Sequence, residues 1–492
     1  MTRCFPVLFS LVLTFGATLA QDTSVAPSIE EGPLKPALEA FQKGQHQEAI
    51  KIATPLAEEG DQDALFLLGF AAETGQGVEA SREKALDYYQ KAAKAGHQEA
   101  SYRRALILLN SPIEADRQLG RESLEEAAKT DKGAASRILG EAWLRGLLSE
   151  KPDPDKALEW WTGAAEAGDS DSLILLARFR SGAFGYPDKV DAEEAIKLYR
   201  KAAENKDQRA FLPLGSMLLN GAESIRQPEE GRKWLNKGIE LGMIDAYLAL
   251  GDFEENVTKD DKAAFKTYLN GANAGQLECM LRTGIFFFNG KGVDASPTMG
   301  LEWLNKASTA GHPRAALELA TLLSKEKEPN IAAIYSQLLI AAEGGLPQAM
   351  NELALFYLSG NFGAADKKAA AAWFTDAAKA GFAPAQHNLA TLFEGGIGVA
   401  FNFANAGELY TLAANQGHAE AATALARMNA QGKGTEQNIP KAWALAKIGV
   451  DRGDEAAKEL LTQIEALLSP ESKSQADAIY KELTKDQPKD DE

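Results

Sequence analysis

The stretch Ala385–Gly417, AQHNLATLFEGGIGVAFNFANAGELYTLAANQG, recurs in related form along nearly the whole chain. Its apolar residues follow helical spacing in two blocks, first at Ala385, Leu389, Ala390 and Phe393, then at Ala406, Leu409, Tyr410, Ala413 and Ala414. Between the blocks, Gly396 and Gly398 can adopt positive φ angles and let the chain reverse, and Gly417 can end the second helix. The stretch predicts two short helices around a glycine turn, a pair that cannot bury its apolar stripes alone.

The residue that opens each first helix is small and sets the period of the repeat. It occurs at Ala64, Ala100, Ala135, Ser172, Ala210, Ala246, Cys279, Ala315, Ala349, Ala385, Ala421 and Ala457, with gaps of 33 to 38 residues. Such a period is typical of stacked helix pairs, of which at least three are needed for stability. The longest gap holds an extra loop, Ser181–Asp191, and the shortest belongs to a copy without the glycine turn. We predict an all-α solenoid of about eleven helix pairs.

The two ends of the chain differ from the repeats. Arg3, the apolar run Phe5–Leu13 and the small residues before Gln21 are typical of a cleaved signal peptide. The alternative is an uncleaved anchor, for which the run is short. Cys4 precedes the apolar run, so we expect no lipoprotein. The predicted segments are a signal peptide at 1–20, a disordered leader at 21–34, an N-terminal cap unit at 35–63, the solenoid at 64–456, capping helices at 457–484 and an acidic disordered tail at 485–492.

Charge and cysteine usage restrict the partners. The formal charge of −18 argues against nucleic acid and against anionic lipid surfaces, because their binders carry a basic face. After the signal segment no stretch predicts a membrane span, so we expect an exported protein of the periplasm or the extracellular space. Cys279 is then the only thiol of the mature chain, which excludes an internal disulfide and predicts a buried, unreactive side chain.

Two copies carry the repeat motif most completely. One runs Leu68-Gly69, Gly75-Gln-Gly77-Val78, Lys84-Ala85, Lys91-Ala92-Ala93 and Gly96, and the other Gly290-Lys-Gly292-Val293, Trp303 and Lys306-Ala307. Over residues 37–457 the chain resembles the Sel-one-like repeats, relatives of tetratricopeptide repeats, and the cap unit resembles a tetratricopeptide unit. The resemblance implies a right-handed superhelix with a concave wall. It also implies a scaffold or adaptor, which in bacteria often serves envelope assembly, exopolysaccharide export, signalling or host contact.

The residues give no sign of catalysis, a metal or a cofactor. Of the five histidines, His46, His97, His312, His387 and His418, three follow a glycine at one repeat position and are interpreted as helix caps. Equivalent residues of different copies lie too far apart to share one metal. The glycine pairs lack a phosphate-loop fingerprint, and Trp160, Trp234, Trp303 and Trp373 share one repeat slot that predicts core packing. Cysteine-rich members of the resembled family have been linked to β-lactam binding or hydrolysis, but this chain lacks their cysteines.

Candidate binding residues are the residues of first helices that lie outside the apolar stripe. In tetratricopeptide-like stacks such residues face the concave wall. They are Phe66, Phe70, Ile285, Phe288, Asn351, Leu355 and His387. If these side chains are exposed, they would anchor a peptide or helix. The alternative is that they are buried between copies. We predict a non-enzymatic, exported scaffold that binds a protein, peptide or polysaccharide along its concave surface. Two alternatives stay open: an architectural component of the envelope or of exopolysaccharide export, and a β-lactamase-like hydrolase.

Overall fold

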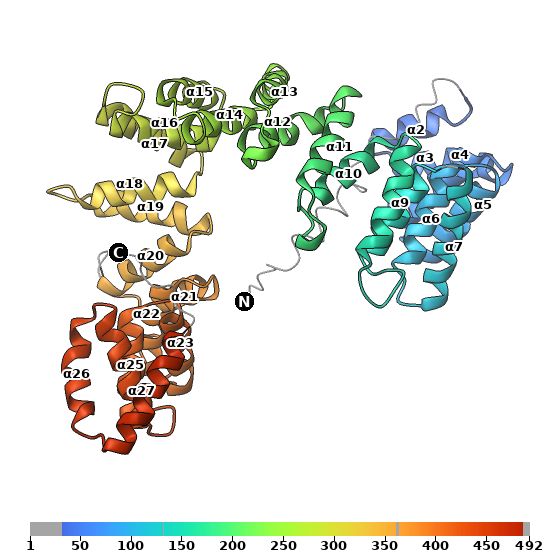
Figure 1. Cartoon of the computed structure of the whole chain (residues 1–492). Helices are drawn as coiled ribbons and strands as arrows, with labels where there is room; N and C mark the ends of the chain where they lie inside the picture. Colours follow the sequence, from blue (N-terminus) through green and yellow to red (C-terminus); the bar gives the residue numbers. More distant parts are fainter. Residues whose placement is uncertain (1–31, 131, 361–363, 486–492) are drawn as a thin grey trace. The chain divides into compact units, whose positions relative to one another are not determined.

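The computed structural model of the chain describes residues 32–130, 132–360 and 364–485. Within these residues every regular element is helical, and consecutive helices pack as pairs (Figure 1). The all-helical repeat fold predicted from the sequence is therefore confirmed. The predicted signal peptide, the leader up to residue 31 and the tail from residue 486 lie outside the described residues.

The chain divides into two compact units, which meet within helix α12 (Phe211–Asn220). Unit 1 contains, in order, α2 (Lys35–Gln42), α3 (His46–Glu58), α4 (Gln62–Thr74), α5 (Arg82–Lys94), α6 (Gln98–Leu109), α7 (Glu114–Thr130), α8 (Ala134–Leu144), α9 (Pro154–Glu166), α10 (Ser170–Arg180), η1 (Pro187–Lys189), α11 (Ala192–Glu204), η2 (Gln208–Ala210) and η3 (Glu223–Ile225). Leu34, which the sequence assigns to the leader, is buried in the first core cluster, so the folded part begins slightly earlier than predicted.

Unit 2 contains the remaining helices. They are α13 (Pro228–Glu240), α14 (Asp245–Asn256), α15 (Asp261–Asn273), α16 (Leu277–Asn289), α17 (Pro297–Thr309), α18 (Pro313–Ser324), α19 (Ile331–Glu343), α20 (Pro347–Ser359), α21 (Lys367–Lys379), α22 (Ala383–Gly395), α23 (Phe403–Asn415), α24 (Ala419–Gln431), α25 (Ile439–Asp451), α26 (Glu455–Glu465) and α27 (Pro470–Thr484). From α14 to α25, each even-numbered first helix packs on the second helix after it, and that helix packs on the next first helix, while α26 and α27 both pack on α25.

Polar side chains cap many of the first helices, although α8, α14, α20 and α22 begin without a side-chain cap, and the helices generally start two residues earlier than the sequence predicts. The Nδ1 atoms of His97, His312 and His418 accept hydrogen bonds from the backbone N–H three residues on, which confirms these histidines as caps. At the other end, glycines such as Gly396 close the helix in the left-handed conformation. Gly398 shows why the next turn needs glycine, because a Cβ there would lie 2.0 Å from the carbonyl oxygen of Lys367.

Large side chains of the second helices fill the core over small residues of the first helices. Tyr268, for example, lies against Gly251, where an added Cβ would be 2.4 Å from the ring. The predicted tryptophan slot is only partly right, since Trp160 and Trp373 are half-buried while Trp161, one position later, is fully buried. Four residues after the small residue, most first helices bury a leucine, at Leu68, Leu139, Leu176, Leu214, Leu250, Leu319, Leu353, Leu389 and Leu425. We call this position the core-leucine slot.

Candidate functional site

The predicted binding residues fall into four environments, and the first is the junction between α4 and α6. Phe66 is buried, with its ring stacked on the His97 ring at 4.3 Å between centroids. Phe70 is half-buried, and the Arg103 guanidinium lies 5.0 Å from its ring centroid. Phe66 therefore belongs to the interface between copies and does not present an exposed anchor.

The second environment lies in unit 2 and is also an interface between helices. Ile285 and Phe288 are half-buried and pack on the core cluster that contains Leu304. Asn351 is buried, and its Oδ1 accepts a hydrogen bond of 2.9 Å from the Asn388 side chain. These contacts hold first helices together, so the expectation that the three residues line an open wall is not met at Asn351 and is only partly met at the other two.

His387 lies in a third kind of contact, with another histidine. Its ring stacks on that of His418, with 4.8 Å between centroids and an angle of 18° between planes. Its Nδ1 atom is buried and has no hydrogen-bond partner among the described residues. Burial, and next the neighbouring His418, lower the pKa of His387, and burial lowers the pKa of His418. The pair is therefore held in its neutral form.

Leu355 is the predicted residue that remains open, at 41% exposure. It lines a groove of about 600 Å³ between the first helices α18 and α20, with the start of α19 at its base. The groove mixes apolar and polar side chains, contributed by Leu317, Ala320, Thr321, Ser324, Pro329, Ile331, Ile334, Leu338, Gln348, Glu352, Leu355, Phe356 and Ser359. Its volume is in the range of pockets that bind small ligands or single side chains of a partner.

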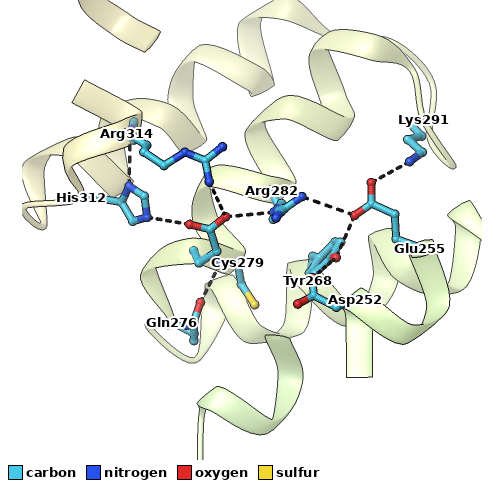
Figure 2. Close-up of polar contacts among 11 residues, drawn as sticks. Asp252, Glu255, Tyr268, Gln276, Cys279, Arg282, Lys291, His312 and Arg314 are labelled. Carbon is cyan, nitrogen blue, oxygen red and sulfur yellow. Dashed lines mark hydrogen bonds and ion pairs between the residues drawn. The ribbon is translucent and has the colours of Figure 1, made fainter. Parts of the chain in front are cut away.

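A polar network lies earlier in the sequence of unit 2. It joins the three successive first helices α14, α16 and α18 (Figure 2). Tyr268 donates its hydroxyl to Asp252 at 2.8 Å and to Glu255 at 2.9 Å, and Lys291 donates to Glu255 at 2.7 Å. Arg282 lies 3.7 Å from the same carboxylate. Burial raises the pKa of Glu255, but Lys291, the Tyr268 hydroxyl and Arg282 outweigh it and hold the pKa below its ordinary value.

The network continues to the next first helix through Glu278. This carboxylate accepts from Arg282 at 3.0 Å, contacts the Nε2 of His312 at 3.0 Å and accepts from Arg314 at 3.4 Å. Because Nδ1 of His312 already accepts the backbone N–H of Ala315, Nε2 carries the proton and donates it to Glu278. Burial raises the pKa of Glu278, but the bond from His312 and the two arginines hold it below its ordinary value.

Cys279 lies inside the network without taking part in its ion pairs. Its side chain is fully buried against Gly271, and its backbone N–H donates to the Gln276 cap at 2.6 Å. Burial raises the pKa of the thiol to about 12, which leaves almost no thiolate at neutral pH. Among the described residues no three histidines, cysteines or carboxylates are placed to hold a metal ion. The network is equipped to join copies, with each carboxylate engaged by hydrogen-bond donors.

The same arrangement occurs at two further junctions. A tyrosine of a second helix donates to a glutamate at the end of its own first helix, and an arginine of the next first helix pairs with that glutamate. The sets are Glu73, Tyr89 and Arg103; Glu255, Tyr268 and Arg282; and Glu394, Tyr410 and Arg427. Sequence reasoning missed this triad. The signal was available, since each glutamate stands nine residues after the small residue of its copy.

Comparison with known proteins agrees with this repeating geometry. The Sel1 repeat family model matches residues 62–97, 134–169, 170–207, 214–243, 277–312, 347–382, 383–418 and 419–454. These segments cover more than half of the chain. Their ends fall on cap residues such as His97, His312 and His418, so the family unit coincides with the helix pairs described above.

Curated relatives match over part of their length. Chitin synthase regulatory factor 3 of Schizosaccharomyces pombe is 25% identical over 277 residues, which cover 54% of this chain and 30% of that protein. The exopolysaccharide production negative regulator of Rhizobium leguminosarum bv. viciae is 27% identical over 151 residues, 27% of this chain and 57% of that protein. The chain thus spans less than two thirds of either relative.

Among solved structures, a protective antigen of uropathogenic Escherichia coli strains that displays an SLR fold aligns with a TM-score of 0.51. The alignment covers 89% of this chain and 94% of the antigen at 24% identity. At this level of identity the likeness concerns the fold alone. None of the described helices combines the length and the hydrophobicity that crossing a bilayer would require.

Proposed function

Because the chain belongs to the Sel1 repeat family, we propose that it is a non-catalytic scaffold that binds a protein partner through the first helices of its repeats. The observation that carries this proposal is the groove between α18 and α20, where Leu355 is exposed beside a half-buried Phe356. An exposed apolar side chain in a groove is the usual place for an anchor residue of a partner. Phe70, Ile285 and Phe288 are half-buried, so they are weaker candidates for a binding surface than Leu355.

The relatives favour a regulatory scaffold over an enzyme. Their printed names describe regulators of chitin synthase and of exopolysaccharide production. In this chain the acidic side chains of the junctions are tied to arginine, lysine, tyrosine or histidine, and Cys279 is a buried thiol. These features support partner binding by shape and many weak contacts, and they give no support to a β-lactamase-like activity.

We place the protein outside the cytoplasm, in the cell envelope, on the strength of residues 1–20 alone. N-terminal sequencing of the mature protein from fractionated cells tests this part, and we expect the mature chain to begin at Gln21. A chain that retains Met1 in the cytoplasmic fraction would contradict it. An envelope or polysaccharide-export role in which the chain acts architecturally remains a second candidate, favoured by the regulator of exopolysaccharide production among its relatives.

The binding proposal is tested with a photo-reactive amino acid at Leu355 and, as a control, at Leu301. The two leucines are 41% and 39% exposed, but Leu301 lies on the second helix α17. We expect irradiation of the envelope fraction to crosslink a discrete partner through position 355 and not through position 301. We also expect Leu355→Asp to abolish co-purification of that partner while Leu301→Asp preserves it. Equal crosslinking at both positions, or an unaffected Leu355→Asp variant, would contradict the proposal.

A further inference from the structure

The core-leucine slot of α6 holds an arginine. Arg104 follows the small residue Ala100 by four positions, where nine other first helices bury a leucine and α16 has Thr283. A guanidinium in a position shaped for an aliphatic side chain loses hydration, and burial lowers the pKa of Arg104. Such a substitution is costly unless a negative group compensates the charge.

The structure provides little compensation for this charge. One Nη atom of Arg104 donates to the Ser123 hydroxyl at 3.4 Å, and its Nε is covered without a hydrogen-bond partner. No carboxylate of the described residues lies within ion-pair distance of it. The adjacent Arg103 behaves differently, because it lies 3.5 Å from Glu73 and 3.2 Å from Glu99. Arg104 is thus a partly buried cation whose hydrogen-bonding capacity is largely unused.

Arg104 lines a pocket of about 480 Å³ between α5, α6 and α7. The pocket is lined by a second cation, two amides and three hydroxyls, contributed by Lys94, Gln90, Gln98, Ser101, Tyr102 and Ser123. Glu126 also lines it, but its carboxylate is paired with Lys129. The pocket therefore presents an excess of positive charge and hydrogen-bond donors in a chain whose net charge is −18.

We propose that this pocket binds a small oxyanion, a carboxylate or a phosphate, with the Arg104 guanidinium as its main ligand. The planar guanidinium fork matches two oxygens of such an anion, and charge-assisted hydrogen bonds of this kind are about twice as strong as neutral ones. Lys94 adds a second positive charge at the rim, and the amides and hydroxyls supply further donors. The site is independent of the partner groove at Leu355, which lies in the other unit.

The test compares wild-type protein with Arg104→Leu, which restores the residue type of the other repeats. Binding is measured by titration calorimetry and thermal shift with inorganic phosphate and with citrate, at constant ionic strength against chloride. We expect one or both anions to bind wild type and raise its melting temperature, because a ligand of the native state stabilises it. Arg104→Leu should bind at least roughly tenfold more weakly. It should also melt no lower than wild type in chloride.

Two further variants keep the result interpretable. Lys94→Gln changes an exposed residue at the rim of the pocket, so this variant should fold like wild type but bind the anion more weakly. Lys197→Gln removes an exposed charge elsewhere in unit 1 and should bind the anion like wild type. Phosphate and citrate arms separate the two kinds of anion. The proposal is overturned if neither anion binds wild type, or if Arg104→Leu and Lys94→Gln bind as tightly as wild type.

Discussion

The junction between α16 and α18 and the junction between α22 and α24 use the same capping histidine with opposite partners. His312 donates to Glu278, a carboxylate of the preceding copy, and is fixed in a network with two arginines. His418 caps its helix in the same way, but the preceding copy offers it the imidazole of His387 instead. At the capping histidine, the first junction is closed by complementary charge and the second by two stacked neutral rings, while the second junction also carries the Glu394–Arg427 ion pair of the triad.

This difference gives the two junctions different sensitivities to acid. Glu278 has a lowered pKa in the folded chain, so its contribution is complete above its ordinary value and is lost only in more acidic solution. His387 and His418 also have lowered pKa values, but their ordinary value is near 6.5, so their contribution is complete above that pH and falls as acid protonates them. Acidification from neutral pH should weaken the α22–α24 junction first.

The largest effect should come from the turns that follow α16 and α22, each of which approaches the second helix of the preceding copy. Gly292 and Gly398 lie in equivalent turns, and an added Cβ would lie 2.1 Å from the carbonyl oxygen of Asp261 or 2.0 Å from that of Lys367. Both also have positive φ angles. We expect Gly292→Ala and Gly398→Ala each to cost about 3 kcal/mol of local stability, measured by hydrogen exchange at the junction concerned.

Gly311 and Gly417 provide the matched controls for those substitutions. They have positive φ angles in the same two copies, but an added Cβ would meet no atom within 4 Å. Alanine there should cost only about 1 kcal/mol, the strain of the left-handed conformation. If all four variants lose the same stability, close approach of the preceding copy is not what requires glycine at the turn.

The next effect distinguishes the α16–α18 junction, where a carboxylate binds the capping histidine, from the α22–α24 junction, where two neutral histidines stack. Glu278→Gln leaves Arg282, Arg314 and His312 without their shared carboxylate, so we expect it to destabilise the α16–α18 junction by about 2 kcal/mol at pH 7. Hydrogen exchange of peptides from α16 and α18 measures this loss, and peptides from α22 and α24 should be unchanged. The exposed pair Glu302–Lys306 serves as control, since Glu302→Gln should cost less than about 0.5 kcal/mol.

The repeat fold could be predicted from the sequence because its determinants are local and occur many times. Ala385, Leu389 and Tyr410 are buried as the helical spacing predicted, and Gly396 and Gly398 have the expected positive φ angles. Each error in one copy is corrected by comparison with the others. The starts of helices were misplaced by about two residues, because the small residue that marks the period follows the capping residue instead of being the cap.

The candidate site was predicted less well, because contacts between copies depend on the rotation of each helix about its axis. Helical spacing separated the core from the remainder but did not distinguish Asn351, which is buried against the next copy, from Leu355, which is exposed. Arg104 was passed over for a related reason. In its copy Pro112 stands where other copies have the glycine turn, but the more informative departure is the charged residue in the core-leucine slot.

The smallest expected effect tests the stacked pair of neutral histidines at the α22–α24 junction. Protonation at Nδ1 of His418 removes the acceptor for the Ala421 N–H and places positive charge at a helix N-terminus, which should cost about 1 kcal/mol, as for other lost N-caps. Around the stacked pair, Glu420 and Asp454 partly offset that charge, Arg427 adds to it, and the Tyr410 ring packs against His387. We expect exchange in α22 and α24, corrected for intrinsic rates, to increase between pH 7 and pH 5.

Two substitutions decide whether the histidines cause that increase. His418→Asn keeps a capping acceptor without a titrating ring, and His387→Phe keeps an aromatic surface while removing the unpartnered Nδ1 atom. The double variant should show the same stability of α22 and α24 at both pH values, while α16 and α18, tied by Glu278, should be insensitive to this pH change in every variant. A pH response that persists in the double variant would show that the histidines do not cause it, and one that appears equally at α16–α18 would remove the distinction between the two junctions.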